Sequence, residues 1–164
     1  MVKKRLKQRK KVRDKYLLPK LYDLGYQIEQ IDFNHQQLVE KGRRKINITA
    51  DLVVKIAEQA AMIITVRNGA EELTEHIKKQ TLSYARLLSD PAPIIILTNG
   101  LEQEVYNTYQ ERKLDSIPSK QKLHNLVNKY RKLSPELKEK ALDDVFTSVS
   151  LWDFTKHKSA YYTK

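Results

Sequence analysis

Three polar residues stand where two predicted strands begin and end. Asp51 opens an apolar run over 51–56, and Thr65 and Arg67 lie at the end of a second run over 61–67. Short runs rich in Val and Ile are typical of buried strands. Side chains at 65 and 67 share a face, which a hairpin would bring close to Asp51. Metal-dependent phosphodiester cleavage uses carboxylates that bind Mg²⁺ and a cation that binds the phosphate, so these residues form a candidate site.

A helix predicted over about 70–88 carries a polar residue within its apolar face. This residue is Gln80, and a buried amide costs free energy unless its polar atoms find partners. Gln80 therefore either bonds the sheet or faces a polar group at the sheet edge. Glu72, His76 and Gln80 recur every four residues and would share one side of the helix. Glu72 could then supply a second carboxylate. The alternative, which we favour, is that Glu72 and His76 form a solvated edge of the helix.

The order of the predicted elements favours an α/β fold. A third apolar strand over 94–97 follows the 70–88 helix, so that this helix crosses between strands of one sheet. We expect a central mixed sheet, with the 70–88 helix on one face and a helix over 12–24 near the other. Further helices follow at the C-terminal end. The segment 34–44 is predicted to be a polar connection.

The chain divides by composition into three parts. At 164 residues we expect one globular domain. The parts are a basic N-terminal arm over 1–11, mobile or loosely helical, a core over 12–110, and a C-terminal helical segment and tail over 111–164.

Most of the net charge of +11 lies at the N-terminus. The first 20 residues hold ten Lys or Arg and one acid, which leaves +2 for the rest of the chain. A basic arm on a nearly neutral body suits a polyanion, with nucleic acid the first candidate. The alternative is a solvated helix that keeps the protein soluble. Seven of the cations lie in the arm and, together with Arg67 and Tyr84, are the predicted nucleic-acid contacts: Lys3, Lys4, Arg5, Lys7, Arg9, Lys10 and Lys11.

Several classes of protein are excluded by what the sequence lacks. Without cysteine there is no disulfide framework and no thiolate metal site. The basic start has no apolar segment of a signal peptide behind it, and no apolar run approaches the roughly 20 residues that span a membrane. We expect a cytoplasmic protein. No Gly-rich phosphate loop of the P-loop type is present, so we expect no P-loop nucleotide site and no helicase motor on this chain. The chain would then be a fragment, a stand-alone protein, or a subunit whose partner supplies such a motor.

The order of these motifs resembles a known family. Asp at a strand start, a polar-Val-basic triplet on the next strand, a helix and an Ile-Leu-Thr-Asn-Gly strand end follow one another. This order is similar to the N-terminal nuclease domain of type I restriction enzyme R subunits, in the PD-(D/E)xK nuclease superfamily. The resemblance covers roughly residues 12–110. It includes the family's Gln-x-x-x-Tyr motif at Gln80-Thr81-Leu82-Ser83-Tyr84, the Val12-Arg13 helix and the Gly25-Tyr26 turn.

The resemblance implies a restriction-endonuclease-like fold and a role for each site residue. Asp51 corresponds to the first metal-binding carboxylate, and Gln80 and Tyr84 belong to the site. Thr65 stands where the family has its second acid, and Arg67 stands where it has lysine. A hydroxyl is a much poorer Mg²⁺ ligand than a carboxylate, and Arg binds phosphate but keeps its proton near neutral pH. Such a site should bind Mg²⁺ weakly and suits binding a phosphate better than cleaving one.

Three functions remain open from the sequence. The first is a DNA-binding domain related to type I restriction enzyme R subunits, with weak or lost Mg²⁺-dependent phosphodiesterase activity. The second is an active endonuclease in which Glu72 replaces the missing metal-binding carboxylate. The third is a protein-interaction module without enzymatic activity. Binding of divalent metal separates the first two, and salt-dependent affinity for DNA separates both from the third.

Overall fold

The centre of the fold is a six-stranded mixed sheet whose strands lie side by side in chain order. The computed structural model describes residues 2–129 and 134–147. All neighbouring strands are antiparallel except β3 and β4, which are parallel and are joined by the crossover helix α3, Glu75–Leu87. The α/β fold and its mixed sheet are therefore confirmed. The strands are β1 Ile31–Lys41, β2 Arg44–Ile56, β3 Gln59–Val66, β4 Ile94–Thr98, β5 Gln103–Asn107 and β6 Lys113–Leu114.

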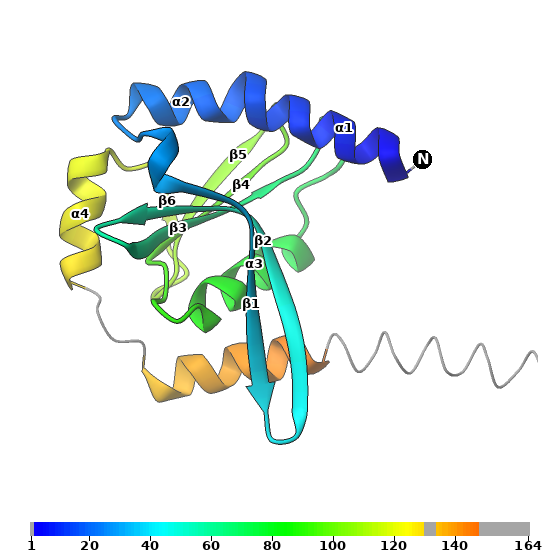
Figure 1. The fold of residues 1–164 in the computed structure, drawn as a ribbon, viewed down its shortest axis with the longest axis vertical. Helices are drawn as coiled ribbons and strands as arrows, with labels where there is room; N and C mark the ends of the chain where they lie inside the picture. The colour runs from blue at the N-terminus through cyan, green and yellow to red at the C-terminus, as the bar shows by residue number, and fades with distance from the viewer. Residues whose placement is uncertain (1, 130–133, 148–164) are drawn as a thin grey trace, which may run out of the picture.

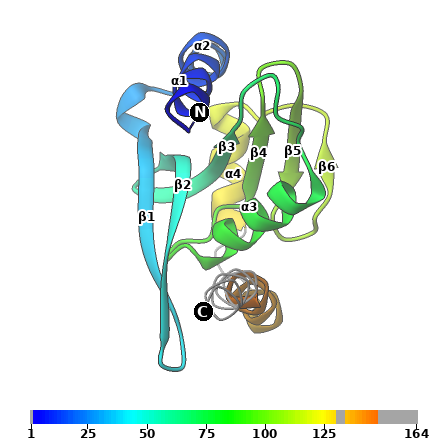
Figure 2. The same ribbon diagram turned by 90° about the vertical axis from the view of Figure 1, so that its right-hand side faces the viewer.

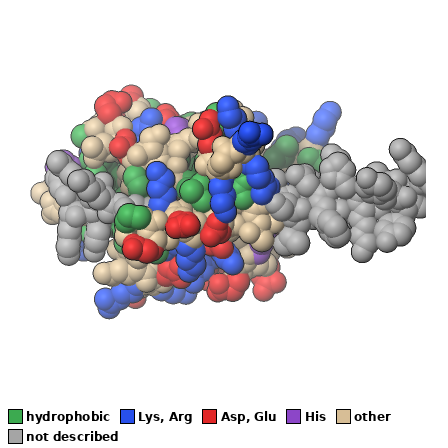
Figure 3. Space-filling model, turned by 90° about the horizontal axis from the view of Figure 1, so that it is seen from below, with side chains coloured by type: hydrophobic (Ala, Val, Ile, Leu, Met, Phe, Trp, Pro, Cys, Tyr) green, Lys and Arg blue, Asp and Glu red, His purple; other side chains and the backbone are tan. Residues whose placement is uncertain are grey.

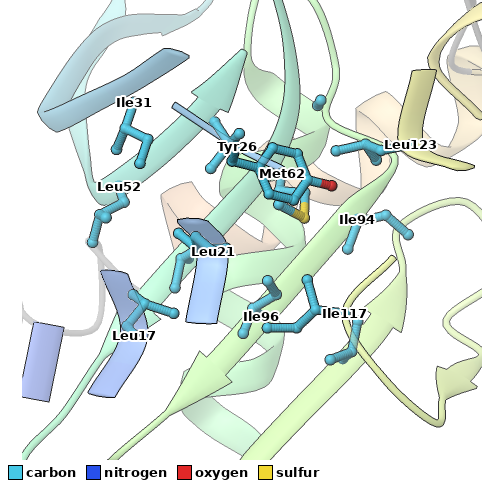
Figure 4. Close-up of a cluster of buried hydrophobic side chains, with 14 of the residues drawn as sticks. Leu17, Leu21, Tyr26, Ile31, Leu52, Met62, Ile94, Ile96, Ile117 and Leu123 are labelled. Atoms are coloured by element: carbon cyan, nitrogen blue, oxygen red, sulfur yellow. The ribbon is translucent and has the colours of Figure 1, made fainter. Parts of the chain in front are cut away.

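Both faces of the central strands are buried, which explains their nearly continuous apolar sequence. Leu52 of β2 and Ile96 of β4 pack under the N-terminal helices and α4 (Lys120–Lys129), as Figure 4 shows. Odd-numbered neighbours such as Val53 and Ile95 pack against α3 on the opposite face. Figures 1 and 2 show these two helical layers with the sheet between them. The two predicted covering helices thus lie where the sequence placed them.

The N-terminal helix is longer than predicted. α1 (Val2–Val12), a π-helical turn (Arg13–Leu17) and α2 (Leu18–Asp23) follow one another without a break. The π turn precedes Pro19, which has no N–H for the helical hydrogen-bond pattern. The helix ends at Gly25, whose φ of +99° and neighbouring hydrogen bonds form a Schellman motif. Of the two predicted alternatives for the arm, mobile or loosely helical, the described residues 2–11 follow the helical one and form a regular α-helix.

The segment 34–44, predicted to be a connection, instead forms most of β1 and the turn of a long hairpin. β1 and β2 pair from Ile31↔Val54 to Lys41↔Arg44 around a two-residue turn. Gly42 in this turn has a φ of +61°, the sign that hairpin turns require and that Gly adopts without strain. The outer face of the hairpin is exposed, so its polar residues are compatible with strand structure. Figure 1 shows the turn projecting beyond the other strands.

The C-terminal part adds a helix over 135–147 that covers the inner face of this hairpin. Ser134 caps its start, since the Leu137 N–H donates to Ser134 Oγ at 3.3 Å. Val145 and Phe146 pack with Val39 and Ile48 of the hairpin. The tail beyond residue 147 lies outside the described residues. Among the residues that are described, no helix is long and apolar enough to cross a membrane.

Candidate functional site

Asp51 and Arg67 meet at the junction of β2 and β3. Asp51 Oδ2 accepts the Val66 N–H at 2.8 Å and lies 3.4 Å from Arg67 Nη1. The same Arg67 nitrogen donates to the Val66 carbonyl at 2.9 Å. The arginine side chain is only 18% exposed, whereas that of Asp51 is 38% exposed. The structure therefore brings these two predicted residues together, as a carboxylate paired with a cation.

The backbone opposite Asp51 is irregular. In the antiparallel register of β1 and β2, Phe33 pairs with Leu52 and His35 with Ala50, while the intervening pair is missing. The residue at the skipped position is Asn34, whose φ is +52°. Such left-handed residues cost free energy when they are not glycine and cluster at functional sites. The irregularity lies beside the candidate carboxylate.

Thr65 and Gln80 have partners other than Asp51. Thr65 Oγ1 lies 2.7 Å from Thr81 Oγ1, which in turn donates to the Ile77 carbonyl within α3. Gln80 Nε2 donates to Tyr84 Oη at 3.0 Å. Gln80 thus bonds the tyrosine of its own Gln-x-x-x-Tyr motif rather than the sheet. The role of the motif in this chain is at least to fix Tyr84 next to the site.

A third charged residue, not predicted from the sequence, completes the site together with Arg9. Glu71 follows β3 in the connection to α3, and Arg9 of α1 reaches it with Nε at 3.1 Å and Nη2 at 2.6 Å. Glu71 Oε2 also accepts the Asn68 N–H at 2.9 Å. Arg9 and Glu71 are 62 residues apart in the chain, so no local pattern links them. α1 is thereby fixed directly above the predicted site.

The charges of these four residues act on one another, as the pKa values of Arg9, Arg67 and Glu71 show. The hydrogen bond from Arg9 lowers the pKa of Glu71, and the Asn68 N–H and the charge of Arg67 lower it further. The bond to Glu71 raises the pKa of Arg9, which also feels Asp51. Burial lowers the pKa of Arg67, and the charge of Arg9 lowers it further, against the opposing charges of Asp51, Glu71 and Tyr84. The site is an alternation of two carboxylates and two guanidinium groups.

The Thr-Asn-Gly strand end holds the segment that carries these charges. The Arg67 N–H donates to the Thr98 carbonyl at 2.8 Å. Asn99 Nδ2 donates to the Glu71 carbonyl at 3.0 Å, so it ties this segment to β4. Gly100 has a φ of +89°, and a Cβ there would lie 3.3 Å from a methyl group of Val12. This strand end therefore positions the site and also leaves room for α1.

Glu72, by contrast, is not on α3. The helix begins at Glu75 because Thr74 caps it, accepting the Ile77 N–H at 3.2 Å. Glu72 lies before this cap and is exposed. The expectation that Glu72, His76 and Gln80 share one side of the helix is wrong for Glu72.

The residues at the site do not fit a Mg²⁺ ion. Such ions are bound by one or two carboxylates with free oxygen atoms. Glu71 instead binds a guanidinium and a backbone N–H, Asp51 binds a backbone N–H beside Arg67, and Thr65 binds Thr81. Within residues 2–129 and 134–147, no group of three His, Cys, Asp or Glu could hold a metal ion. The arrangement is suited to binding an anion once a guanidinium changes partner.

Six of the seven predicted basic contacts remain available on the surface of α1. All six are exposed, whereas Arg9 is half-buried against Glu71. The exposed residues are Lys3, Lys4, Arg5, Lys7, Lys10 and Lys11. The predicted contact surface thus has a helical shape, and Arg9 has a structural partner.

Arg86 is a buried cation that the sequence analysis did not single out. Its side chain is 2% exposed, and its Nε and Nη2 donate to the Thr108 carbonyl at 3.0 and 2.7 Å. Glu111 lies 3.3 Å from Nη2. Arg86 therefore ties α3 to the end of β5. In the sequence, only its position on the apolar face of the predicted helix could have indicated that Arg86 is buried.

We expect the Arg9–Glu71 pair to stabilise the fold in a pH-dependent way. Glu71→Gln should lower the free energy of unfolding by about 1–2 kcal/mol at neutral pH, since the pair is only partly exposed. The pKa of Glu71 is lower in the folded state, so its contribution is present above the unfolded value and is lost as pH falls through the folded value. Urea unfolding at neutral and acid pH measures this.

The matched control is Glu72→Gln, which removes the same charge from the next, exposed residue. It should change stability by less than about 0.5 kcal/mol. Equal effects of the two substitutions at all pH values would contradict the assignment.

Comparison with known proteins agrees with this architecture. The sequence model of the family described as "Type I restriction enzyme R protein N terminus (HSDR_N)" matches residues 8–119. The fold also matches a solved fragment, described as an HsdR subunit of a type I restriction enzyme from Vibrio vulnificus YJ016, with a TM-score of 0.55 and 16% identity. The match covers 71% of this chain and 24% of that one, so this chain spans about a quarter of its length. No curated protein matches the chain. Because the family model matches more than half of the sequence, the chain belongs to the family of type I restriction enzyme R protein N termini.

Proposed function

We propose that this chain is a DNA-binding domain with a restriction-endonuclease-like fold that has lost most or all of its Mg²⁺-dependent cleavage. The observation that carries the proposal is that each carboxylate of the site is paired with an arginine. Arg67 and Arg9 neutralise Asp51 and Glu71, the two carboxylates of the site. A metal ion would have to displace a guanidinium, and like charges repel. The same guanidinium groups are suited to phosphate.

The exposed side of α1 supports the binding half of the proposal. Its six free cations lie on a helix that begins beyond the sheet and passes over the site, as Figures 1 and 2 show. A row of Lys and Arg on a rigid helix binds the phosphate backbone through release of counterions. Divalent metal would bind weakly and would not be needed for this contact.

The alternative of an active nuclease that uses Glu72 gains no support. Glu72 is exposed and lies outside α3, whereas Glu71 faces the site and is paired with Arg9.

The matched fragment is described as part of a restriction enzyme subunit, and this chain spans only a quarter of it. We therefore propose that a partner, or another part of a longer chain, supplies the motor, and that the domain acts on DNA in the cytoplasm.

Titration of a fluorescent DNA duplex with the protein tests the proposal. We expect a dissociation constant that rises steeply with salt, with a slope of about −0.9 for each phosphate neutralised. Polyglutamate, which is also acidic but has no phosphate, should compete poorly. Absence of binding at about 0.05 M salt, where phosphate contacts are strongest, would contradict DNA binding and favour a protein-interaction module.

A further inference from the structure

The outer face of the β1–β2 hairpin is a polar surface that the proposed site does not use. Here we call residues 34–49 the ribbon. Its inner face is covered, since Val39 and Ile48 pack on the helix over 135–147. Gln37, also on the inner side, donates to the Leu87 carbonyl at the end of α3. The outer face is exposed throughout and carries Gln36, Leu38, Asn47 and Thr49.

These outer residues lie opposite one another in two pairs. Gln36 pairs with Thr49, and Leu38 pairs with Asn47. Side chains of directly paired residues are about 5 Å apart on one face of a sheet. Three hydrogen-bonding side chains therefore form one compact patch. Amides both donate and accept hydrogen bonds.

The turn of the ribbon is strongly basic. Four of the five residues from 41 to 45 are Lys or Arg, and all are exposed. Three have nearby partners: Lys41 contacts Asp143, Arg44 stacks on the Phe146 ring at 5.0 Å, and Lys45 lies 3.6 Å from Glu40. Figure 3 views the molecule from the side of this turn and shows Lys and Arg side chains interspersed with acids.

We propose that the ribbon inserts its outer face into the major groove of duplex DNA, with the turn contacting the flanking phosphates. The inference rests on the proposed DNA binding and names a second surface for it. A major groove about 12 Å wide admits a two-stranded β-ribbon, and amide side chains hydrogen-bond to base edges there. The strand from Gln36 to Lys41 is about 17 Å long at the usual rise per residue. That length spans about five base pairs.

The geometry favours DNA over double-stranded RNA. The A-form major groove is deep and narrow, so side chains of a ribbon cannot enter it. The site and α1 lie near the other end of the hairpin, as Figure 1 shows. Ribbon and α1 would therefore contact different parts of the same duplex.

Two double variants test the ribbon by different readouts. Arg43→Ala with Lys45→Ala removes two charges from the turn; it should weaken DNA binding about 10- to 60-fold at 0.1 M salt and reduce the salt slope by about 1.8. Gln36→Ala with Asn47→Ala removes two neutral groups; it should weaken binding about 5- to 30-fold with the salt slope unchanged. Circular dichroism and thermal unfolding establish that each variant is folded.

The matched control is Arg112→Ala with Lys122→Ala, which removes the same two residue types from exposed positions outside the ribbon, just before β6 and on α4. Its affinity should stay within about twofold of that of the unaltered protein if these residues make no phosphate contact. If the unaltered protein binds DNA and the ribbon variants bind as the control does, the ribbon inference is overturned while the proposed function stands. Equal competition by double-stranded RNA also overturns it. If the unaltered protein binds no DNA, both fall.

Discussion

Removing the charges of α1 is expected to lower the affinity for duplex DNA by about 100- to 1,000-fold at roughly 0.1 M salt. The variant replaces the six exposed cations of α1 by Gln and keeps Arg9, so that the contact with Glu71 is retained. Gln is a good helix former, and α1 should persist. The salt slope should fall by up to about 5, since each phosphate contact contributes about 0.9. Fluorescence anisotropy over a salt series measures both quantities.

Arg9→Ala is the matched control, because it removes one charge and releases α1 from Glu71. Its effect on the salt slope should not exceed about 1. Deletion of residues 1–11 removes all seven cations and should weaken binding at least as much as the six Gln substitutions do. An unchanged affinity in the variant with six substitutions would show that α1 is not part of the DNA-binding surface.

Restoring the family pattern at the strand end is expected to create metal binding where the unaltered chain has little. Thr65→Glu together with Arg67→Lys adds a carboxylate beside Asp51 and removes the guanidinium that faces it. Two carboxylates supply the anionic oxygen atoms that Mg²⁺ prefers. We expect a dissociation constant for Mg²⁺ in the millimolar range, measured by calorimetry. The loss of the Thr65–Thr81 bond should cost about 1 kcal/mol of stability.

Thr65→Glu alone is the control for this second prediction. The new carboxylate would pair with Arg67 rather than with a metal ion, so metal affinity should rise little. Adding Arg9→Gln to the double variant should strengthen metal binding further, because it frees Glu71. Calorimetry without a metal-dependent signal in either multiple variant would contradict the view that residues 65 and 67 are what the site lacks.

The sequence predicted the structure correctly where the local pattern of apolar residues matches their burial in the fold. The apolar runs around Val53, Ile63 and Ile95 predicted the central strands because these strands are buried on both faces. Strand parity predicted that Arg67 would reach Asp51, and the structure brings them together. Helices were expected at the C-terminal end, and the structure begins one there, capped by Ser134.

Three features could not be read from local pattern. The outer half of β1 was predicted to be a connection because it contains few apolar residues; only contacts with the helix over 135–147 explain its strand structure. The partner of Arg9 depends on how α1 crosses the sheet, which no spacing reveals. A helical period suggests Glu72 as a possible second carboxylate, but the helix begins only after Thr74, and no local pattern points to Glu71. Tertiary packing and a capping residue decided these cases.

The central claim is that the chain keeps a nuclease fold but has a site whose carboxylates are neutralised by its own arginines. Incubating supercoiled plasmid with the unaltered protein and Mg²⁺ or Mn²⁺ tests it most directly, with Asp51→Ala as the reference. The predicted result is salt-dependent binding of the plasmid and no more nicking than Asp51→Ala produces. Robust metal-dependent nicking that Asp51→Ala abolishes would contradict the claim and would make Glu71 the first residue to test as a metal ligand.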